Sequence, residues 1–261
     1  MDQQSLRLLA ESFLGGQLSE SAFMQEMRNR WTLGVSGSQI DLDRQRRCGF
    51  PEVVYGEGKQ LEEIRDIFLA QQERQIAPFA TRITPEYGEQ LKSWFPEAEY
   101  NALGRTFRFP HPEASAKDRG KVAIITAGTS DRPVAEEAIE TARWIGCELV
   151  LLYDIGVAGP QRLLQQLPLL QNIDVAVVIA GMEGALPSVV GGHLACPVIA
   201  VPTSVGYGAS LGGMTALLGM LNSCASNVTV VNIDAGFKGA YVAGLMAQKV
   251  GEARNQLKKE L

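Results

Sequence analysis

Two reactive side chains stand out because of the residues around them. Glu183 follows an apolar run and lies between glycines in AGMEGALP, where a folded chain has no structural need of an acid. A carboxylate in a dry pocket can act as a base or contact a substrate. Cys224 lies among small polar residues in NSCASN, which predicts that its thiol is accessible. An ionised thiol is a nucleophile. The alternatives are a solvated loop acid and an inert cysteine.

The segment TAGTSDRP, at residues 126–133, could bind an anion. A turn between a strand and a helix directs free backbone amides toward a ligand, and Gly128 permits a tight turn. Ser130 could cap the helix and donate a hydrogen bond to a phosphate, and Asp131 could hold a ribose hydroxyl or a metal ion. An ordinary helix cap is the alternative. The segment is not a Walker loop, because it lacks the sequence G-K-[ST].

Two further segments could contact a ligand. VPTSVGYGASLGG, at residues 201–213, is dense in small residues, so its backbone could approach a ligand and Tyr207 could stack on a ring. A flexible connection would have the same composition. Arg47 is the last residue of a charge run at residues 41–47 and could bind a phosphate bidentately, although a solvated charge run is the usual explanation. His193 is expected to be a core histidine, because no second ligand accompanies it.

Alternating strands and helices must position these segments. In the second half of the chain, near-continuous Val and Ile runs separate helical patterns, which predicts a parallel sheet with helices on both faces. Strands are expected at residues 121–128, 147–154, 173–181, 196–202 and 228–234, and helices at 130–146, 159–171, 185–195, 210–224 and 240–259. Ligands of such sheets bind beyond the carboxyl ends of the strands, which selects the loops after the first four strands.

The first half is less regular and predicts a small α+β domain. Helices are expected at residues 4–14, 19–31, 60–75 and 85–95, and strands at 78–83 and 105–109. The segment FPHPEASAKDRG, at residues 109–120, has the composition of a linker, and 18 of the 27 glycines follow residue 119. We therefore expect an N-terminal α+β domain at residues 1–119 and a second domain at 120–261.

Composition excludes several classes of protein. Hydrophobic residues make up 46% of the 261 residues, which is enough for a packed core, and no apolar run approaches the roughly 18 residues that span a bilayer. The net charge of -5 argues against a nucleic-acid binder, which needs clustered Lys and Arg. The four cysteines form no C-x-x-C pair, and the N-terminus does not read as a signal peptide. We expect a cytoplasmic protein with no membrane partner.

Residues 121–250 resemble the PurE family of aminoimidazole ribonucleotide carboxylases and mutases. The shared features are Gly128-x-Ser130-Asp131, Ala180-Gly181 followed by Ala185-Leu186-Pro187, and Val201-Pro202. In that family these loops hold the ribonucleotide phosphate and the carboxylation site. The resemblance implies a flavodoxin-like or Rossmann-like parallel sheet. The family's S-x-H-R-T-P segment supplies its catalytic histidine, whereas the corresponding YDIGVAGP, at residues 153–160, contains none. This departure counts against purine biosynthesis.

Nearly the whole chain resembles the LarB family, the synthases of pyridinium-3,5-biscarboxylic acid mononucleotide. The matching segments are DRQRRCGFPEVVYGEGK (43–59), TAGTSDRPVAEEA (126–138), YDIGVAG (153–159), GMEGALPSVVGG (181–192), VPTSVGYG (201–208), NSCA (222–225) and NIDAGF (232–237). The resemblance implies that nicotinic acid adenine dinucleotide is the substrate. Its pyridinium ring would be carboxylated with CO2 or bicarbonate, and its phosphoanhydride would be hydrolysed to release AMP. The product is the first intermediate of the nickel-pincer nucleotide, the cofactor of lactate racemase.

The same resemblance assigns roles to residues. Cys224 would add to the pyridinium ring beside its nitrogen, which activates the free meta carbon for CO2, and Glu183 would remove the ring proton. The residues expected to bind substrate are Gly128, Thr129, Ser130, Asp131, Asp154, Gly156, Gly181, Met182, Gly184, Ser204, Gly206, Tyr207, Gly208 and Arg47. Asp131 and Asp154 are candidate ligands of a divalent metal such as Mg2+ that would assist hydrolysis. PurE-type domains assemble as octamers with sites near subunit contacts, so a homo-octamer is expected.

Two other functions remain open from the sequence. One is an aminoimidazole ribonucleotide carboxylase whose catalytic residues are displaced. The other is a non-catalytic module that binds a dinucleotide.

Overall fold

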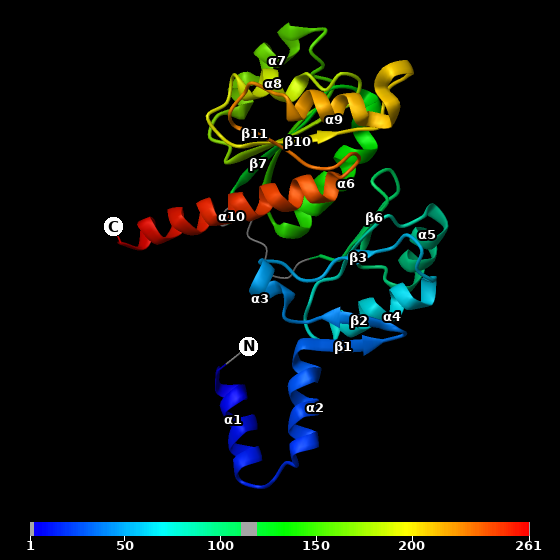
Figure 1. Cartoon of the computed structure of the whole chain (residues 1–261), viewed down its shortest axis with the longest axis vertical. Coiled ribbons are helices and arrows are strands. Elements are labelled where there is room, and N and C mark those ends of the chain that lie inside the picture. The colour runs from blue at the N-terminus through cyan, green and yellow to red at the C-terminus, as the bar shows by residue number, and fades with distance from the viewer. Residues whose placement is uncertain (1–2, 111–118, 261) are drawn as a thin grey trace. The chain divides into compact units, whose positions relative to one another are not determined.

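The chain forms two compact units, Met1–Ala80 and Thr81–Leu261, in a computed structural model that describes residues 3–110 and 119–260 (Figure 1). Residues 111–118, most of the predicted linker, lie outside the described residues. The predicted domain boundary at residue 119 therefore stays a prediction. No helix of the described part is long and apolar enough to cross a membrane.

The second unit is built on a five-stranded parallel sheet, as the sequence predicts. Its strands are β7 (Lys121–Thr126), β8 (Glu148–Leu152), β9 (Val175–Ala180), β10 (Val198–Pro202) and β11 (Val228–Val230). The strand order is β11-β10-β9-β7-β8, and all neighbouring strands are parallel. Because β8 and β9 pair on opposite sides of β7, the direction of winding reverses there. A crevice for a ligand is expected at such a reversal.

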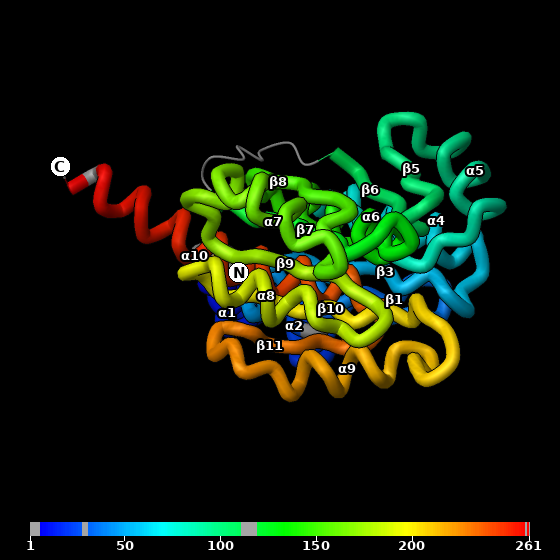
Figure 2. Tube along the Cα trace, turned by 90° about the horizontal axis from the view of Figure 1, so that it is seen from above, coloured from blue at the N-terminus to red at the C-terminus, as the bar shows by residue number. Residues whose placement is uncertain are grey.

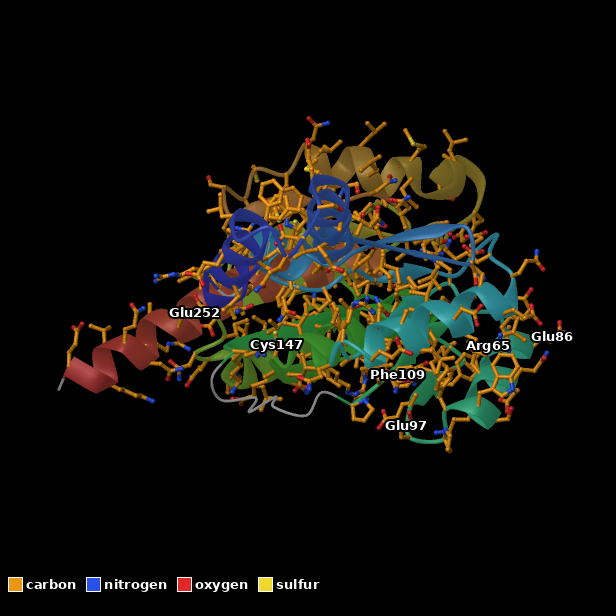
Figure 3. The ribbon with its side chains drawn as sticks, turned by 90° about the horizontal axis from the view of Figure 1, so that it is seen from below. Arg65, Glu86, Glu97, Phe109, Cys147 and Glu252 are labelled. Carbon is orange, nitrogen blue, oxygen red and sulfur yellow. The ribbon has the colours of Figure 1, made fainter. Side chains whose placement is uncertain are left out.

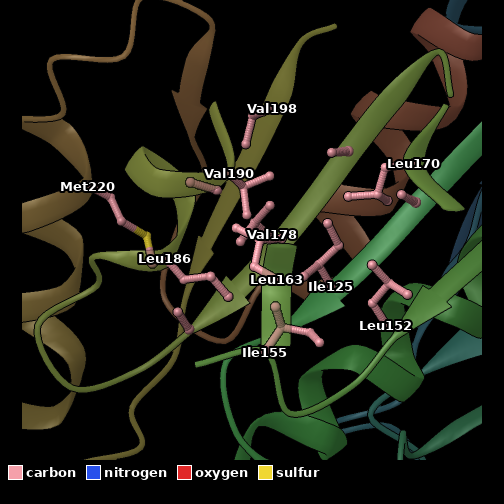
Figure 4. Packing of buried hydrophobic residues seen from close by; sticks show 14 of the residues in the cluster. Ile125, Leu152, Ile155, Leu163, Leu170, Val178, Leu186, Val190, Val198 and Met220 are labelled. Carbon is pink, nitrogen blue, oxygen red and sulfur yellow. The ribbon is translucent and has the colours of Figure 1, made fainter. Parts of the chain in front are cut away.

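Helices cover both faces of this sheet. They are α6 (Arg132–Ile145), α7 (Pro160–Gln166), α8 (Leu186–Gly191), α9 (Met214–Leu221) and α10 (Gly236–Glu260). Ile125 and Val178 of the sheet join one buried cluster with Leu163 of α7, Leu186 of α8 and Met220 of α9 (Figure 4).

The opposite face of the sheet lies against α10, which also packs on α6. A Cβ at Gly239 of α10 would come within 2.6 Å of Val201 on this face. The C-terminal end of α10 extends beyond the sheet (Figure 2). Alternate strand residues thus face the two helical layers, so the strands are apolar on both faces.

Two of the helices are shorter than predicted, because single residues within the predicted ranges do not continue a regular α-helix. The helix expected at 159–171 ends at Gln166 and continues as a 3-10 turn over Leu167–Leu170, because Pro168 has no amide proton to donate. The helix expected at 210–224 begins only at Met214. Residues 208–213 form a 3-10 turn, in which Leu211 and Gly212 have positive φ angles of 46° and 64°.

The first unit contains α1 (Gln3–Leu14), α2 (Glu20–Trp31), β1 (Thr32–Val35), β2 (Ser38–Asp41), α3 (Arg44–Cys48), β3 (Val54–Tyr55) and α4 (Leu61–Gln72), and β4 (Phe79–Thr81) lies at the boundary. The antiparallel hairpin β1–β2 was not expected from the sequence. Its turn residues, Ser36 and Gly37, have φ angles of 46° and 83°, as the tightest hairpins require. Ile64 and Phe68 of α4 are fully buried.

Three short elements precede the parallel sheet in the second unit. They are α5 (Pro85–Trp94), β5 (Glu99–Asn101) and β6 (Thr106–Arg108), and β5 pairs antiparallel with β6. Thr84 caps α5 by accepting a hydrogen bond from the amide of Tyr87. Helix α5 and strand β6 agree with the predicted positions, whereas β5 was not expected.

Candidate functional site

A cavity of about 310 Å³ lies beyond the carboxyl ends of β7, β8 and β9. The turn after β7 contributes Gly128, Ser130 and Asp131, and the loop after β9 contributes Gly181, Met182 and Glu183. Gly156 and Arg162 follow β8, and Val205 follows β10. The position is the one expected for a doubly wound sheet. Seven of the residues that were expected from the sequence therefore line one cavity.

Asp131 fixes the turn after β7 to the loop after β10. Its carboxylate accepts hydrogen bonds from the Thr203 hydroxyl, at 2.7 Å, and from the Gly128 amide, at 2.9 Å. The side chain is buried, and this burial raises the pKa of Asp131, whereas the Thr203 hydroxyl and nearby backbone amides lower it. Both carboxylate oxygens are engaged, so Asp131 shapes the cavity rather than offering a free ligand. Thr203 was not among the residues expected.

The turn that presents Glu183 has a constrained backbone. Met182 has a φ of 53°, and a Cβ at Gly184, whose φ is 70°, would come within 2.7 Å of the Ala216 carbonyl oxygen. The amide of Met182 donates to the carbonyl of Val205 at 2.9 Å. The Glu183 side chain is exposed and forms no ion pair with any residue that the structure describes. Among the described residues, its carboxylate therefore has no charged partner.

Arg162 supplies the positive charge of this cavity. It forms an ion pair with Asp154, with 2.8 Å between Nη1 and Oδ2. Gly156 and Gly159 leave room for it, since a Cβ at either would come within 3.5 Å of the guanidinium. Asp154 itself is not among the residues that line the cavity, so it positions Arg162. Arg162 was not expected from the sequence, although its place in the first turn of the helix after β8 could have indicated it.

The residues proposed as metal ligands do not form a metal centre. Asp131 is fully engaged by Thr203 and Gly128, and Asp154 is paired with Arg162. Within residues 3–110 and 119–260, no group of three or more His, Cys, Asp or Glu side chains could hold a metal ion. This set of donors does not fit a resident divalent cation, and the expectation of Mg2+ stays a prediction.

A second cavity of about 270 Å³ adjoins the first, and Ser130 and Val205 line both. Ser204 lines this second cavity, and its amide donates to the Asp234 carboxylate at 2.9 Å. The remaining residues expected in the loop after β10 lie outside both cavities: Gly206, Tyr207 and Gly208. Tyr207 is 82% exposed. Thr129, in the turn after β7, is also exposed and lines neither cavity.

Of the four cysteines, Cys224 alone is exposed. Burial raises the pKa of the Cys147 thiol to about 12, and Cys147 lies within the second unit (Figure 3). Burial also raises the pKa of Cys196. Cys224 is in the loop that leads into the start of β11, and it does not line the cavity that contains Glu183. A single chain therefore does not bring the two expected catalytic residues into one cavity.

Arg47 belongs to the first unit, in α3. It forms ion pairs with Asp41 and with Asp43, the latter at 3.1 Å, and its hydrogen bond with Asp41 raises the pKa of Arg47. Its expected contact with substrate stays a prediction.

Comparisons with known proteins agree with this architecture. A family model described as LarB/PurE-like N-terminal domain matches residues 33–111, and one described as AIR carboxylase matches residues 121–261. An uncharacterized protein of Methanocaldococcus jannaschii is 38% identical over 253 residues, which cover 94% of this chain and 98% of the relative.

Two further matches each cover about half of this chain. An N5-carboxyaminoimidazole ribonucleotide mutase of Methanocaldococcus jannaschii is 31% identical over 152 residues, which cover 54% of this chain and 92% of the relative. The crystal structure of a variant of Treponema denticola PurE2 matches 54% of this chain and 93% of its own, with 19% identity and a TM-score of 0.41. The chain belongs to the LarB/PurE-like carboxylase family, in which a LarB/PurE-like N-terminal domain precedes an AIR carboxylase domain.

Proposed function

We propose that the protein carboxylates the pyridinium ring of nicotinic acid adenine dinucleotide and hydrolyses its phosphoanhydride. The products would be pyridinium-3,5-biscarboxylic acid mononucleotide and AMP, and the first would enter the synthesis of the nickel-pincer nucleotide in the cytoplasm. The observation that carries the proposal is the composition of the first cavity. It combines a free carboxylate, Glu183, with a cation, Arg162, and no histidine lines it.

A carboxylate suits the proton transfer that this reaction needs. The thiolate of Cys224 adds to a ring carbon, and the ring electrons move onto the nitrogen. The meta carbon of the resulting dihydropyridine then forms a bond to CO2. Glu183 accepts the proton of that carbon, the carbon–sulfur bond breaks, and the thiolate leaves as the ring becomes aromatic again. In the hydrolysis, the oxygen of a water molecule forms a bond to one phosphorus atom and the bond between that atom and the bridging oxygen breaks. The protons of the water pass to the departing phosphate oxygen and to solvent, and AMP is released.

The arginine suits the substrate. Arg162 is oriented by Asp154, and a guanidinium binds a carboxylate or a phosphate through two parallel hydrogen bonds. Nicotinic acid adenine dinucleotide carries both kinds of group. Arg162 would thus bind the anionic end of the ring or the adjacent phosphate while Glu183 faces the carbon that loses its proton.

We further propose that the protein works as a homo-octamer and that a second copy contributes Cys224 to each cavity. Residues 184–233 contain no Asp, Glu, Lys or Arg. Large apolar side chains are exposed at helical spacing along and just before α9, namely Leu211, Met214, Leu218 and Leu221. Burial of such a face against another copy would remove apolar surface from water. Cys224 follows this helix directly.

The match to an N5-carboxyaminoimidazole ribonucleotide mutase favours a second candidate, which is carboxylation of an aminoimidazole ribonucleotide. The absence of histidine from the lining of the first cavity weighs against it, because the related enzymes use a histidine at this place.

Mass spectrometry would test the main proposal. Full-length protein is incubated with nicotinic acid adenine dinucleotide and 13C-labelled bicarbonate, and labelled pyridinium biscarboxylate and AMP are the expected products. Glu183→Gln should lower the rate of carboxylation by about 10² to 10⁴. Glu86→Gln, at an exposed acid of α5, is the matched control and should leave the rate unchanged. Unchanged dinucleotide with folded, ligand-binding protein would refute the proposal and favour a binding module, whereas turnover of an aminoimidazole ribonucleotide would favour the second candidate.

Mixing two inactive variants would test the shared site. Cys224→Ala and Glu183→Gln should each be inactive alone, and mixed octamers should regain part of the activity, because some cavities receive both intact residues. The Cys196→Ala variant is the control for the loss of a cysteine elsewhere in the chain, and it should remain active. Gel filtration that gives a monomer, or mixed octamers that stay inactive, would refute a site built from two copies.

A further inference from the structure

The short loop that carries Cys224 is anchored on both sides of that residue. Residues 222–227 join α9 to β11, and we call them the cysteine loop. Loops that connect a helix to a strand are usually more mobile than the elements they join. In this loop, however, the side chains of Ser223 and Asn227 are hydrogen-bonded to the segment between Leu186 and Val198. Contacts that are distant in sequence therefore fix its conformation.

Asn227 makes the stronger of the two anchors. Its Nδ2 donates to the carbonyl oxygens of Gly191, Leu194 and Cys196, at 3.2, 3.0 and 3.0 Å. A carboxamide nitrogen has two protons, so the three carbonyls share them. The backbone carbonyl of Asn227 also accepts a hydrogen bond from the amide of Val198 at 2.9 Å. One residue thus joins the end of α8, the turn that follows it and the start of β10 to the end of the cysteine loop.

Gly191 leaves the room that the Asn227 carboxamide occupies. A Cβ at Gly191 would come within 2.8 Å of Oδ1 of Asn227 and within 3.0 Å of the Cβ of Ala225. Gly191 is the last residue of α8, where alanine would be favoured by helix propensity. The glycine is therefore required by space. Any larger residue at this position would displace the carboxamide or the cysteine loop.

The second anchor lies on the other side of Cys224. The hydroxyl of Ser223 is 2.7 Å from the hydroxyl of Ser188 in α8, and it accepts a hydrogen bond from the amide of Ala225 at 3.2 Å. The amide of Val228 in turn donates to the carbonyl of Ala225 at 3.2 Å. The residues before and after Cys224 are thus both held, while Cys224 itself is exposed.

The helices that hold the cysteine loop also hold the turn of Glu183. Helix α8 begins three residues after Glu183. A Cβ at Gly219 of α9 would come within 2.5 Å of the Glu183 carbonyl oxygen, and one at Gly184 would come within 2.7 Å of the Ala216 carbonyl oxygen. Helix α9, which leads into the cysteine loop, therefore lies directly against this turn. Within one chain, the positions of Glu183 and Cys224 are fixed by the same two helices.

We infer that Asn227 is a positioning residue for the thiol of Cys224, with the bond between Ser188 and Ser223 as a second anchor. The part that Cys224 takes in the reaction rests on the proposed function. A thiolate must reach a ring carbon at bonding distance, and misplacement of a reacting group by about 1 Å can lower a rate by about 10²-fold. Asn227 lines neither the first nor the second cavity. Its loss should therefore lower the rate of the chemical step and leave substrate binding unchanged.

Steady-state kinetics of carboxylation by the full chain would test this role. Asn227→Ala should lower kcat about 10²-fold and leave KM within about twofold. Gly191→Ala keeps the carboxamide but displaces it, so it should act in the same direction. Ser223→Ala should lower kcat about three- to tenfold, and adding Ser188→Ala should lower it no further, because both remove the same hydrogen bond. Ser226→Ala, at an exposed residue of the same loop, is the control and should leave kcat and KM unchanged.

Hydrogen exchange followed by mass spectrometry needs no substrate, so it separates this inference from the proposed function. The amides of Ala225 and Val228 should exchange about tenfold faster or more in Asn227→Ala and Gly191→Ala than in the unaltered protein, whereas those of α10 should not change. Exchange that is unchanged in the loop, or accelerated equally in α10, would overturn the inference, as would a loss of activity through KM alone. Faster exchange in the loop, with no carboxylation by the unaltered protein, would refute the proposed function and leave Asn227 as the residue that fixes the cysteine loop.

Discussion

The hydrogen bond between Asp131 and Thr203 joins two loops that are 72 residues apart and should be measurable as a coupling energy. Replacing Asp131 by alanine leaves the Thr203 hydroxyl and the Gly128 amide without their shared acceptor. An unsatisfied buried donor costs about 1–3 kcal/mol, so the two together cost about 2–6 kcal/mol. Burial disfavours the charged carboxylate of Asp131 and so raises its pKa. Replacing Asp131 removes this unfavourable burial, which offsets part of the cost. We expect Asp131→Ala to lower the free energy of unfolding by about 2 kcal/mol.

The effect of a second substitution on the free energy of unfolding distinguishes the loss of this hydrogen bond from a general disturbance of packing. Thr203→Val keeps the shape of the side chain and removes the donor, so it should cost about 1–2 kcal/mol in the unaltered protein. In the Asp131→Ala background the same change removes a hydroxyl that has already lost its partner. There it should be neutral or stabilising, which gives a coupling energy of about 1 kcal/mol or more.

Urea unfolding followed by circular dichroism at pH 7 would give the four stabilities of this cycle. Ser130→Ala, one residue before Asp131 and exposed, is the control and should change the stability by less than about 0.5 kcal/mol. Equal costs of Thr203→Val in both backgrounds would refute the reasoning, because they would mean that the two side chains do not interact.

Two further predictions concern the stability of the second unit. Since the folded state raises the pKa of Cys147 from 9.0 to about 12, the unfolded chain loses this proton first, and each pH unit above 9 should lower the stability by about 1.4 kcal/mol until the pH approaches 12. In urea titrations, Cys147→Ala should remove this part of the slope and Cys224→Ala should not; burial also raises the pKa of Tyr100 and of Tyr153, so a shallower slope should remain. An unchanged slope in Cys147→Ala would contradict the assignment. Gly184→Ala would place a Cβ within 2.7 Å of the Ala216 carbonyl at a φ of 70°, so we expect a loss of at least about 1–2 kcal/mol in thermal unfolding, and a variant as stable as the parent would contradict this account.

The parallel sheet could be predicted because its signal is local. Each strand of the second unit is a continuous apolar run, and Val177 and Val178 of β9 are both fully buried although they face opposite sides. The carboxyl-end rule then selected the loops that contain Gly128 and Gly181. Both glycines line the cavity at the reversal of winding, as expected.

The errors in the predicted secondary structure also have local causes, which the pattern of hydrophobic residues does not reveal. The hairpin β1–β2 depends on positive φ angles at Ser36 and Gly37, and its strands have only four residues each. Leu211 fits a helical pattern, but its φ of 46° ends the regular helix before Met214. Backbone conformation at single residues therefore determines both the hairpin and the start of α9.

By itself, the sequence determined the apolar runs, their alternation with helices and the edge of the sheet at which polar loops gather. These properties depend on residues close together in the chain, because burial on two faces requires a continuous apolar run. Only the tertiary structure decided that Asp131 is held by Thr203 and that Asp154 orients Arg162. Each depends on the distance between side chains from different loops, which packing of the whole unit fixes and which no local pattern of residues contains.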